Sequence, residues 1–240
     1  MKKLLRQYGF SLEQVDAIFV THDHADHIKA VGNMANELNK PIYATEKVHV
    51  GINNNYCTTS KVTEPSRRYI YKGEECRIGD LRITPFEVSH DSSDCVGFKV
   101  QQGDLTFCLA TDVGEVTPTV ARSIEEANYL VLEANHDEEM LRYGGYPVYL
   151  KRRILSDHGH LSNDNCARLA RHLADSGTRR IILGHLSREN NTPALALEAV
   201  ERAVAPFGAA VTVAPRGTAA NRGQTMGVLS EELYKLTTGE

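Results

Sequence analysis

The segment that most constrains this chain is Val20–His27, which reads Val-Thr-His-Asp-His-Ala-Asp-His. It places three imidazoles and two carboxylates within six residues, directly after an apolar run that ends at Val20. Apolar side chains then recur at helical spacing, so we expect the segment to form the turn between a strand over residues 16–20 and a helix over residues 27–39. Rigid elements on both sides would hold these polar side chains while the loop keeps them accessible.

The spacing within the segment favours metal binding. In an extended chain His22 and His24 point to the same side, because side chains alternate with a period of two, so both can reach one ion. Asp26 and His27 follow where the chain turns into the helix and can reach a second ion. Neutral imidazole with carboxylate suits zinc, and also manganese or iron. The alternative is a polar loop rich in His and Asp, but its clustered charges would cost stability unless a cation were present.

The His-x-His-x-Asp-His run resembles the signature of the metallo-β-lactamase superfamily, whose fold is an α/β (α+β) four-layer αββα sandwich. Strand-rich blocks flanked by helices in both halves of the chain agree with two sheets packed face to face. The resemblance implies a further His at a strand end, a bridging Asp and a late His. The candidates for these ligands are His90, Asp112 and His185.

The same resemblance implies two divalent ions, zinc in the first place and manganese as the alternative. The first ion would be held by His22, His24 and His90. The second would be held by Asp26, His27 and His185, with Asp112 bridging the two. Two such ions lower the pKa of a bound water and stabilise the attacking and leaving oxygens of a phosphodiester, so hydrolysis is the implied chemistry.

Two later segments indicate which subfamily the chain resembles. An apolar strand over residues 128–134 carries Glu133 near its end, and His160 lies just before a helix that Ser162 opens. In the tRNA 3′-processing and related nucleases of this superfamily, a Glu after such a strand orients a His that serves the leaving group. Glu133 and His160 match those positions, and the candidate catalytic residues are therefore Asp26, Glu133 and His160. The competing interpretation is a solvent-exposed Glu and an ordinary His near a helix N-terminus.

The longest match is to the YycJ/WalJ-like family of metallo-β-lactamase-fold proteins, which is associated with exonuclease activity on DNA. The resemblance covers roughly residues 10–214. The motifs that carry it are Glu-Ala-Asn-His-Asp at 133–137, Tyr-Pro at 146–147, Leu-Lys-Arg-Arg-Ile-Leu-Ser at 150–156, Gly-His-Leu-Ser-Asn at 159–163 and His-Leu-Ser-Arg-Glu-Asn-Asn at 185–191.

The sequence departs from this family at its start. Members begin with a strand hairpin that carries a Gly-Ser-rich turn and an Asp-x-Gly, ahead of the helix that we expect over residues 1–9. Those N-terminal strands are missing from this sequence. We therefore expect either a sheet with fewer strands beside the metal loop or a start that lies further upstream.

Four basic residues are the candidate phosphate contacts, because they lie in or beside the matching motifs. They are Lys151, Arg152, Arg153 and Arg188. A solvated helix face is the competing interpretation. With a net charge of −4, the chain has no general attraction for nucleic acid, so such a partner has to be bound by a local basic patch of this kind.

Composition predicts a cytoplasmic protein, and the resemblance implies one metallo-β-lactamase-fold domain over residues 1–240, with residues 215–240 an unassigned tail. Its content of 41% hydrophobic and 24% charged residues is typical of soluble globular proteins. Five cysteines without a Cys-x-x-Cys pair indicate reduced thiols. No apolar stretch indicates a membrane partner, and no pattern predicts an oligomeric state.

These features together predict a two-metal phosphodiesterase that acts on nucleic acid, most simply a 5′ DNA exonuclease. Two alternatives stay open. The same site could hydrolyse a small ester, thioester or cyclic phosphate, or the chain could be an inactive metal-binding regulatory protein.

Overall fold

The computed structural model describes residues 9–214, which form two compact units that divide between Ile70 and Tyr71. The helix predicted for residues 1–9 falls almost wholly outside this range, as does the tail from residue 215. The single domain over residues 1–240 stays a prediction. No helix among residues 9–214 is long and apolar enough to cross a membrane, and all five cysteines are free.

The first unit contains a parallel sheet of three short strands in the order β1-β2-β3. The strands are β1 Ile18–Phe19, β2 Ile42–Ala44 and β3 Arg67–Tyr69. The helices of this unit are α2 Ala25–Ile28, α3 Val31–Glu37 and α4 Glu46–Asn54, with short 3₁₀ turns at Leu12–Gln14 and Glu64–Ser66. The core of this unit includes Ile28, Val31, Ile42, Val48 and Ile52.

The helix predicted over residues 27–39 is wrong in its extent. The structure has two helices there, α2 and α3, with a break at residues 29–30. Because α2 starts at residue 25, Asp26 and His27 lie within it, and helical geometry sets the directions of their side chains. The Thr45 hydroxyl accepts a hydrogen bond from the Val48 amide at 3.4 Å and so caps the N-terminus of α4.

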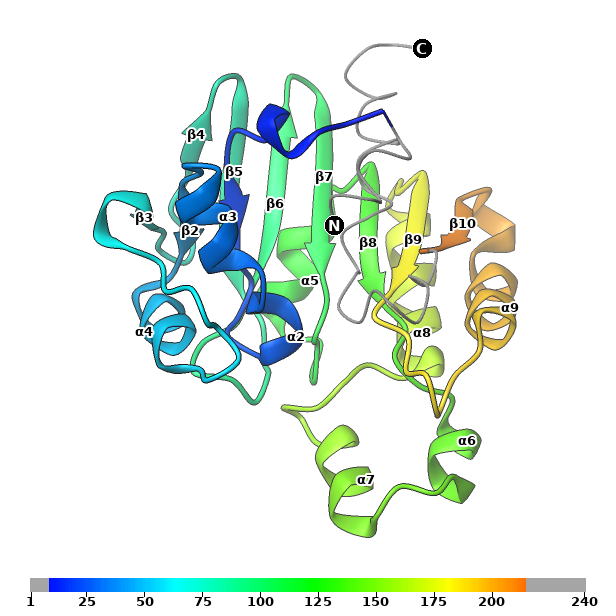
Figure 1. Cartoon of the computed structure of the whole chain (residues 1–240). Helices are drawn as coiled ribbons and strands as arrows, with labels where there is room; N and C mark the ends of the chain where they lie inside the picture. Colours follow the sequence, from blue (N-terminus) through cyan, green and yellow to red (C-terminus); the bar gives the residue numbers. More distant parts are fainter. Residues whose placement is uncertain (1–8, 215–240) are drawn as a thin grey trace. The chain divides into compact units, whose positions relative to one another are not determined.

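The second unit contains a seven-stranded sheet in the order β10-β9-β8-β7-β6-β5-β4 (Figure 1). The strands are β4 Cys76–Ile78, β5 Leu81–Glu87, β6 Val96–Gln102, β7 Leu105–Ala110, β8 Tyr129–Glu133, β9 Arg180–Gly184 and β10 Ala210–Val213. Pairing is antiparallel from β4 to β7 and parallel from β7 to β10. Strands β5, β7, β8 and β9 therefore all run in the same direction, and their carboxyl ends lie at one edge.

Helices provide the connections between the parallel strands. They are α5 Pro118–Ile124, α6 Glu138–Tyr143, α7 Val148–Ile154, α8 Asn163–Asp175 and α9 Pro193–Val204, with a 3₁₀ turn at Ala205–Phe207. Apolar side chains of α5, α8 and α9 share one core with the buried side chains of β7, β8 and β9. The sequence shows no clear helical pattern for α6 and α7, because residues 136–156 mix charge with two glycines.

Candidate metal centre and catalytic residues

In the first unit, the segment Val20–His27 connects β1 to α2, as the sequence predicts. The His22 ring lies edge-on to the His24 ring, with centroids 4.7 Å apart, and 4.1 Å from the His27 ring. The Thr21 hydroxyl contacts Nδ1 of His22 at 3.0 Å. Asp26 lies beside His27, with its carboxylate 3.8 Å from the His27 ring nitrogen Nε2. The loop thus gathers its three imidazoles into one cluster.

The other acidic side chain of this loop, Asp23, lies against α4. A Cβ atom at Gly51 would come within 1.8 Å of Asp23 Oδ2 and within 2.7 Å of Asp23 Cβ. The side-chain amide of Asn55 donates a hydrogen bond to the Asp23 carbonyl at 3.2 Å. These contacts support the loop on α4, and they explain why a residue without a side chain stands at position 51.

In the second unit, the predicted ligands and Glu133 lie at the carboxyl ends of four strands. His90 follows β5, Asp112 follows β7, Glu133 ends β8 and His185 follows β9. In open α/β sheets, this edge is where ligands bind. Asp112 and His185 adopt left-handed backbone conformations, with φ of 60° and 55°. Such conformations are costly for residues other than glycine and concentrate at functional sites.

The hydrogen bonds of His90 and His185 determine which ring nitrogen carries the proton. Nδ1 of His90 lies 3.1 Å from the carbonyl oxygen of Gly159, and Nδ1 of His185 lies 2.7 Å from Oε1 of Glu133. The partner of His90 is a backbone carbonyl and the partner of His185 is a carboxylate. Both of these groups only accept hydrogen bonds, so each Nδ1 must donate. In the neutral rings, the lone pair is therefore on Nε2.

Both Nε2 atoms face the same carboxylate oxygen. Oδ1 of Asp112 lies 3.6 Å from Nε2 of His90 and 3.4 Å from Nε2 of His185. A lone pair directed at an anionic oxygen is repelled unless a cation lies nearby, and imidazole with carboxylate is the donor set of zinc and related divalent ions. The residues of this unit therefore fit a metal ion.

The Glu133 carboxylate accepts four hydrogen bonds at this edge of the sheet. Its Oε1 atom accepts hydrogen bonds from Nδ1 of His160 at 2.9 Å and of His185 at 2.7 Å. Its Oε2 atom accepts from the backbone amides of Val113 at 2.8 Å and Leu161 at 3.0 Å. Burial alone would raise the pKa of this carboxyl, but His160 and His185 outweigh burial and hold the pKa below its ordinary value.

His160 lies beside the predicted ligands of this unit. It shares Oε1 of Glu133 with His185, and its Nδ1 lies 3.9 Å from Oδ1 of Asp112. Its ring centroid is 5.0 Å from that of His90 and 5.2 Å from that of His185. Burial lowers the pKa of His160, but the Glu133 carboxylate outweighs burial, so the net pKa is raised above its ordinary value. With Nδ1 held by Glu133, Nε2 is the atom of His160 that can deliver a proton.

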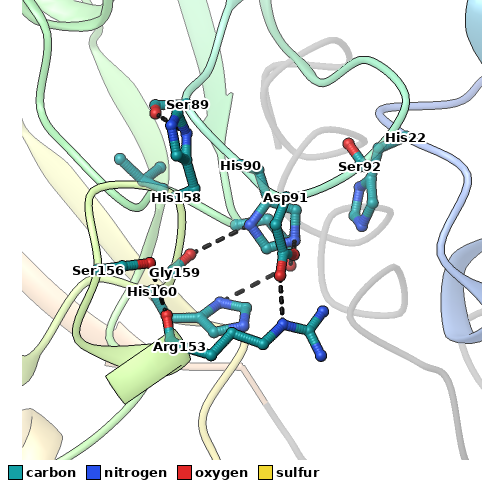
Figure 2. A network of polar contacts seen from close by, with 12 residues as sticks. His22, Ser89, His90, Asp91, Ser92, Arg153, Ser156, His158, Gly159 and His160 are labelled. Carbon is teal, nitrogen blue, oxygen red and sulfur yellow. Dashed lines mark hydrogen bonds and ion pairs between the residues drawn. The ribbon is translucent and has the colours of Figure 1, made fainter. Parts of the chain in front are cut away.

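A loop after α7 places His160. Figure 2 shows the Ser89 hydroxyl against Nδ1 of His158, at 2.8 Å, and the ring of His90 against the Gly159 carbonyl. Arg153 of α7 forms an ion pair with Asp91, the neighbour of His90 (Figure 2). The loop and the last turn of α7 are therefore tied to the segment after β5 through Ser89, His90 and Asp91.

Asn135 is a supporting residue that the sequence motifs do not single out as a ligand. Its side-chain amide donates to the carbonyl of His185 at 2.9 Å, and its own carbonyl accepts from the Ser187 amide at 2.7 Å. These bonds hold the left-handed turn at His185. The available signal was the position of Asn135 two residues after Glu133, in one of the motifs shared with the YycJ/WalJ-like family.

The four predicted phosphate contacts differ in their surroundings. Arg153 is paired with Asp91, and the Lys151 ammonium donates to the Arg142 carbonyl at 2.8 Å. Arg152 lies exposed on α7, and Arg188 lies exposed in the segment after β9. Two of the four cations are therefore already engaged within the second unit.

Gly159 lets the loop that carries His160 approach α7 closely. A Cβ atom there would lie 2.1 Å from the Ile154 carbonyl oxygen and 2.4 Å from that of Arg153. Gly159→Ala is therefore expected to lower the free energy of unfolding by about 1–3 kcal/mol, because backbone atoms have to move. Gly145→Ala is the matched control, since nothing lies within 4 Å of a Cβ at that position. Equal urea midpoints for the two variants would contradict this account.

A carboxylate between imidazoles, set at the carboxyl ends of sheet strands beside a hydrogen-bonded Glu–His pair, defines a metallo-hydrolase. The chain belongs to the β-lactamase superfamily: the family model described as "Beta-lactamase superfamily domain" matches residues 3–186. The chain is 39% identical over 193 residues to exodeoxyribonuclease WalJ of Streptococcus pneumoniae serotype 2 (strain D39), covering 80% of this chain and 71% of that protein. It is 35% identical over 199 residues to exodeoxyribonuclease YycJ of Bacillus anthracis, covering 83% and 74%.

A solved structure gives the same fold. The metallo-β-lactamase-fold protein YhfI from Bacillus subtilis superposes with a TM-score of 0.65 at 19% identity, covering 89% of this chain and 80% of that one. The fold class predicted from the sequence and the resemblance to the YycJ/WalJ-like family are both confirmed.

Proposed function

We propose that this protein is a two-metal phosphodiesterase that cleaves DNA from its 5′ end. The observation that carries the proposal is the pair of Nε2 atoms of His90 and His185 facing one Asp112 oxygen, at 3.6 and 3.4 Å. The order of the family motifs along the chain supports His22, His24, Asp26 and His27 as the remaining ligands. Zinc is the proposed metal, with manganese as the alternative.

When bound, two divalent ions supply an activated water and stabilise charge on the attacking and leaving oxygens. The residues of the chain provide the rest. Asp112, His90 and His185 are held in orientation before any ion binds, the last two through Gly159 and Glu133. Glu133 also holds His160 with a proton on Nδ1, so Nε2 can protonate the departing oxygen.

The need for a general acid supports a phosphodiester substrate. The sugar oxygen that leaves a phosphodiester is a strong base, and it has to receive a proton or a metal ion as it departs. A thioester has a far less basic leaving group and gains little from such an acid. The names of the two relatives point to DNA as the polymer, and the 35–39% identity supports the same substrate here.

One assay tests the proposed function most directly. The protein is incubated with 5′-phosphorylated duplex DNA, single-stranded DNA and RNA of one sequence, with added zinc or manganese. We expect release of nucleotides from the 5′ end of DNA and no release in the presence of chelator. Cleavage of RNA alone, or of none of the polymers when a small phosphodiester is hydrolysed, would overturn the assignment to DNA.

The basic residues of α7 should contribute to DNA binding by neutralising phosphates. Changing both Arg152 and Arg153 to Ala is expected to weaken binding and to lower the slope of log Kd against log salt by about 1, because the Arg152 guanidinium no longer displaces a counterion from the DNA, whereas Arg153 is already paired with Asp91. Arg202→Ala, an exposed position on α9, is the control. A salt slope equal to that of the wild-type protein would favour a small substrate instead.

A further inference from the structure

The helical pair α6–α7 exposes large aromatic side chains, which is unusual outside binding surfaces. Tyr143, at the end of α6, is 79% exposed, and Tyr149, in the first turn of α7, is 74% exposed. Val148 and Leu155 nearby are 64% and 60% exposed. Within the second unit, α6 and α7 lie beyond the carboxyl ends of β8 and β9, the edge that carries Glu133 and His185 (Figure 1).

This pair of helices is attached firmly to the catalytic residues. The Lys151 ammonium bonds the Arg142 carbonyl and so joins α7 to α6. The backbone amide of His160 donates to the carbonyl of Ile154, in the last turn of α7, at 3.0 Å. Asp91, the partner of Arg153, is the residue after His90. A molecule bound on α7 is therefore held at a fixed distance from His160.

An aromatic and a cationic side chain are neighbours on the exposed surface of α7. Tyr149 and Arg152 are three residues apart, so they are neighbours on the helix surface. Among residues 9–214, no hydrogen bond or ion pair engages the guanidinium group of Arg152 or Arg142. Tyr149 thus has an available cation beside it on the helix surface, and Arg142 lies exposed at the end of α6, next to Tyr143 in sequence.

An exposed tyrosine beside an exposed arginine favours one kind of ligand. Apolar side chains alone would suit a protein partner, but a flat aromatic ring next to an available guanidinium matches the base and the phosphate of a nucleotide. Stacking needs a base whose face is open, which a base inside a duplex does not offer. The ligand that fits is therefore a single strand, or the unpaired end of a duplex.

We propose that α6 and α7 form a stacking platform for unpaired nucleotides, with Tyr149 and Tyr143 stacking on bases and Arg152 and Arg142 contacting phosphates. The proposal rests on the proposed function and specifies its substrate: the end of the strand is bound unpaired beside His160. This placement accounts for the exposed tyrosines, for which the chemistry of hydrolysis alone gives no reason.

The platform is tested by binding and not by cleavage. Fluorescence anisotropy is measured in chelator with a labelled oligothymidylate and with a blunt duplex of the same length. Tyr149→Ala is expected to weaken binding of the single strand by about 5- to 100-fold, the range found for loss of one stacked base, and binding of the duplex less. Tyr149→Phe retains the ring and should bind within about twofold of the wild-type protein. Tyr56→Ala, at a 91% exposed position in the first unit, is the control for an aromatic side chain elsewhere.

The possible outcomes separate the platform from the proposed function. If Tyr149→Ala binds the single strand as the wild-type protein does, or if Tyr149→Phe is weakened as much as Tyr149→Ala, base stacking on α7 is wrong. A wild-type protein that binds neither oligonucleotide yet hydrolyses a p-nitrophenyl phosphodiester would instead overturn the polymer substrate and leave α6–α7 as a surface for a protein partner. Equal melting temperatures of all variants exclude an effect through folding.

Discussion

Asp112→Ala is expected to remove at least one of two bound metal ions and to lower phosphodiester turnover by on the order of 10³. Asp112 is 1% exposed, and its Oδ1 atom faces the Nε2 atoms of His90 and His185. Without this carboxylate, the two imidazoles have no anionic partner between them, and an ion held there loses a ligand. Several kcal/mol of transition-state stabilisation by a metal ion corresponds to this fall in rate.

The measurement is elemental analysis of protein purified without chelator, together with turnover of the same preparation. Asp104→Ala, in the exposed turn between β6 and β7, is the control and should keep full metal content. Finding two ions in Asp112→Ala, or none in the wild-type protein, would contradict the assignment of Asp112 as a ligand.

His160→Ala is expected to lower turnover of DNA by on the order of 10²–10⁴, the usual contribution of a general acid, while metal content stays unchanged. The reason is that His160 contacts Glu133 through Nδ1 and leaves Nε2 for the leaving oxygen. A p-nitrophenyl phosphodiester, whose leaving group departs without a proton, should be affected far less. Loss of metal from His160→Ala would make His160 a ligand, and equal slowing of both substrates would make it a binding residue.

Glu133→Ala is expected to differ from His160→Ala in its metal content. Because Glu133 supports His185 as well as His160, its loss is expected to reduce metal content in addition to turnover. It also leaves the buried amides of Val113 and Leu161 without an acceptor, at a cost of about 1–3 kcal/mol each. A variant with full metal content and wild-type stability would show that the carboxylate only orients His160.

The sequence by itself was sufficient for the features that depend on neighbouring residues. The spacing of His22, His24 and His27 predicted a strand–turn–helix that gathers imidazoles, and the rings do cluster. The resemblance to the metallo-β-lactamase superfamily implied Asp112 and His185 as strand-end ligands, and the apolar runs that end just before or at Asp112, Glu133 and His185 agree with those positions. Local patterns carry this information because a strand buried on both faces needs a continuous apolar run, and a ligand has to come after the run ends.

Only the tertiary structure decided how the side chains at these strand ends support one another. Glu133 joins residues 20 and 52 positions away in sequence, Val113 and His185, and Arg153 pairs with an aspartate 62 positions away. The left-handed conformations of Asp112 and His185 were likewise invisible in the sequence, because nothing in an Asp or His residue demands them. Such pairings depend on which strands lie side by side, β7 with β8 and β8 with β9. Strand order is fixed by burial of the whole sheet and its helices, so no short motif can specify it.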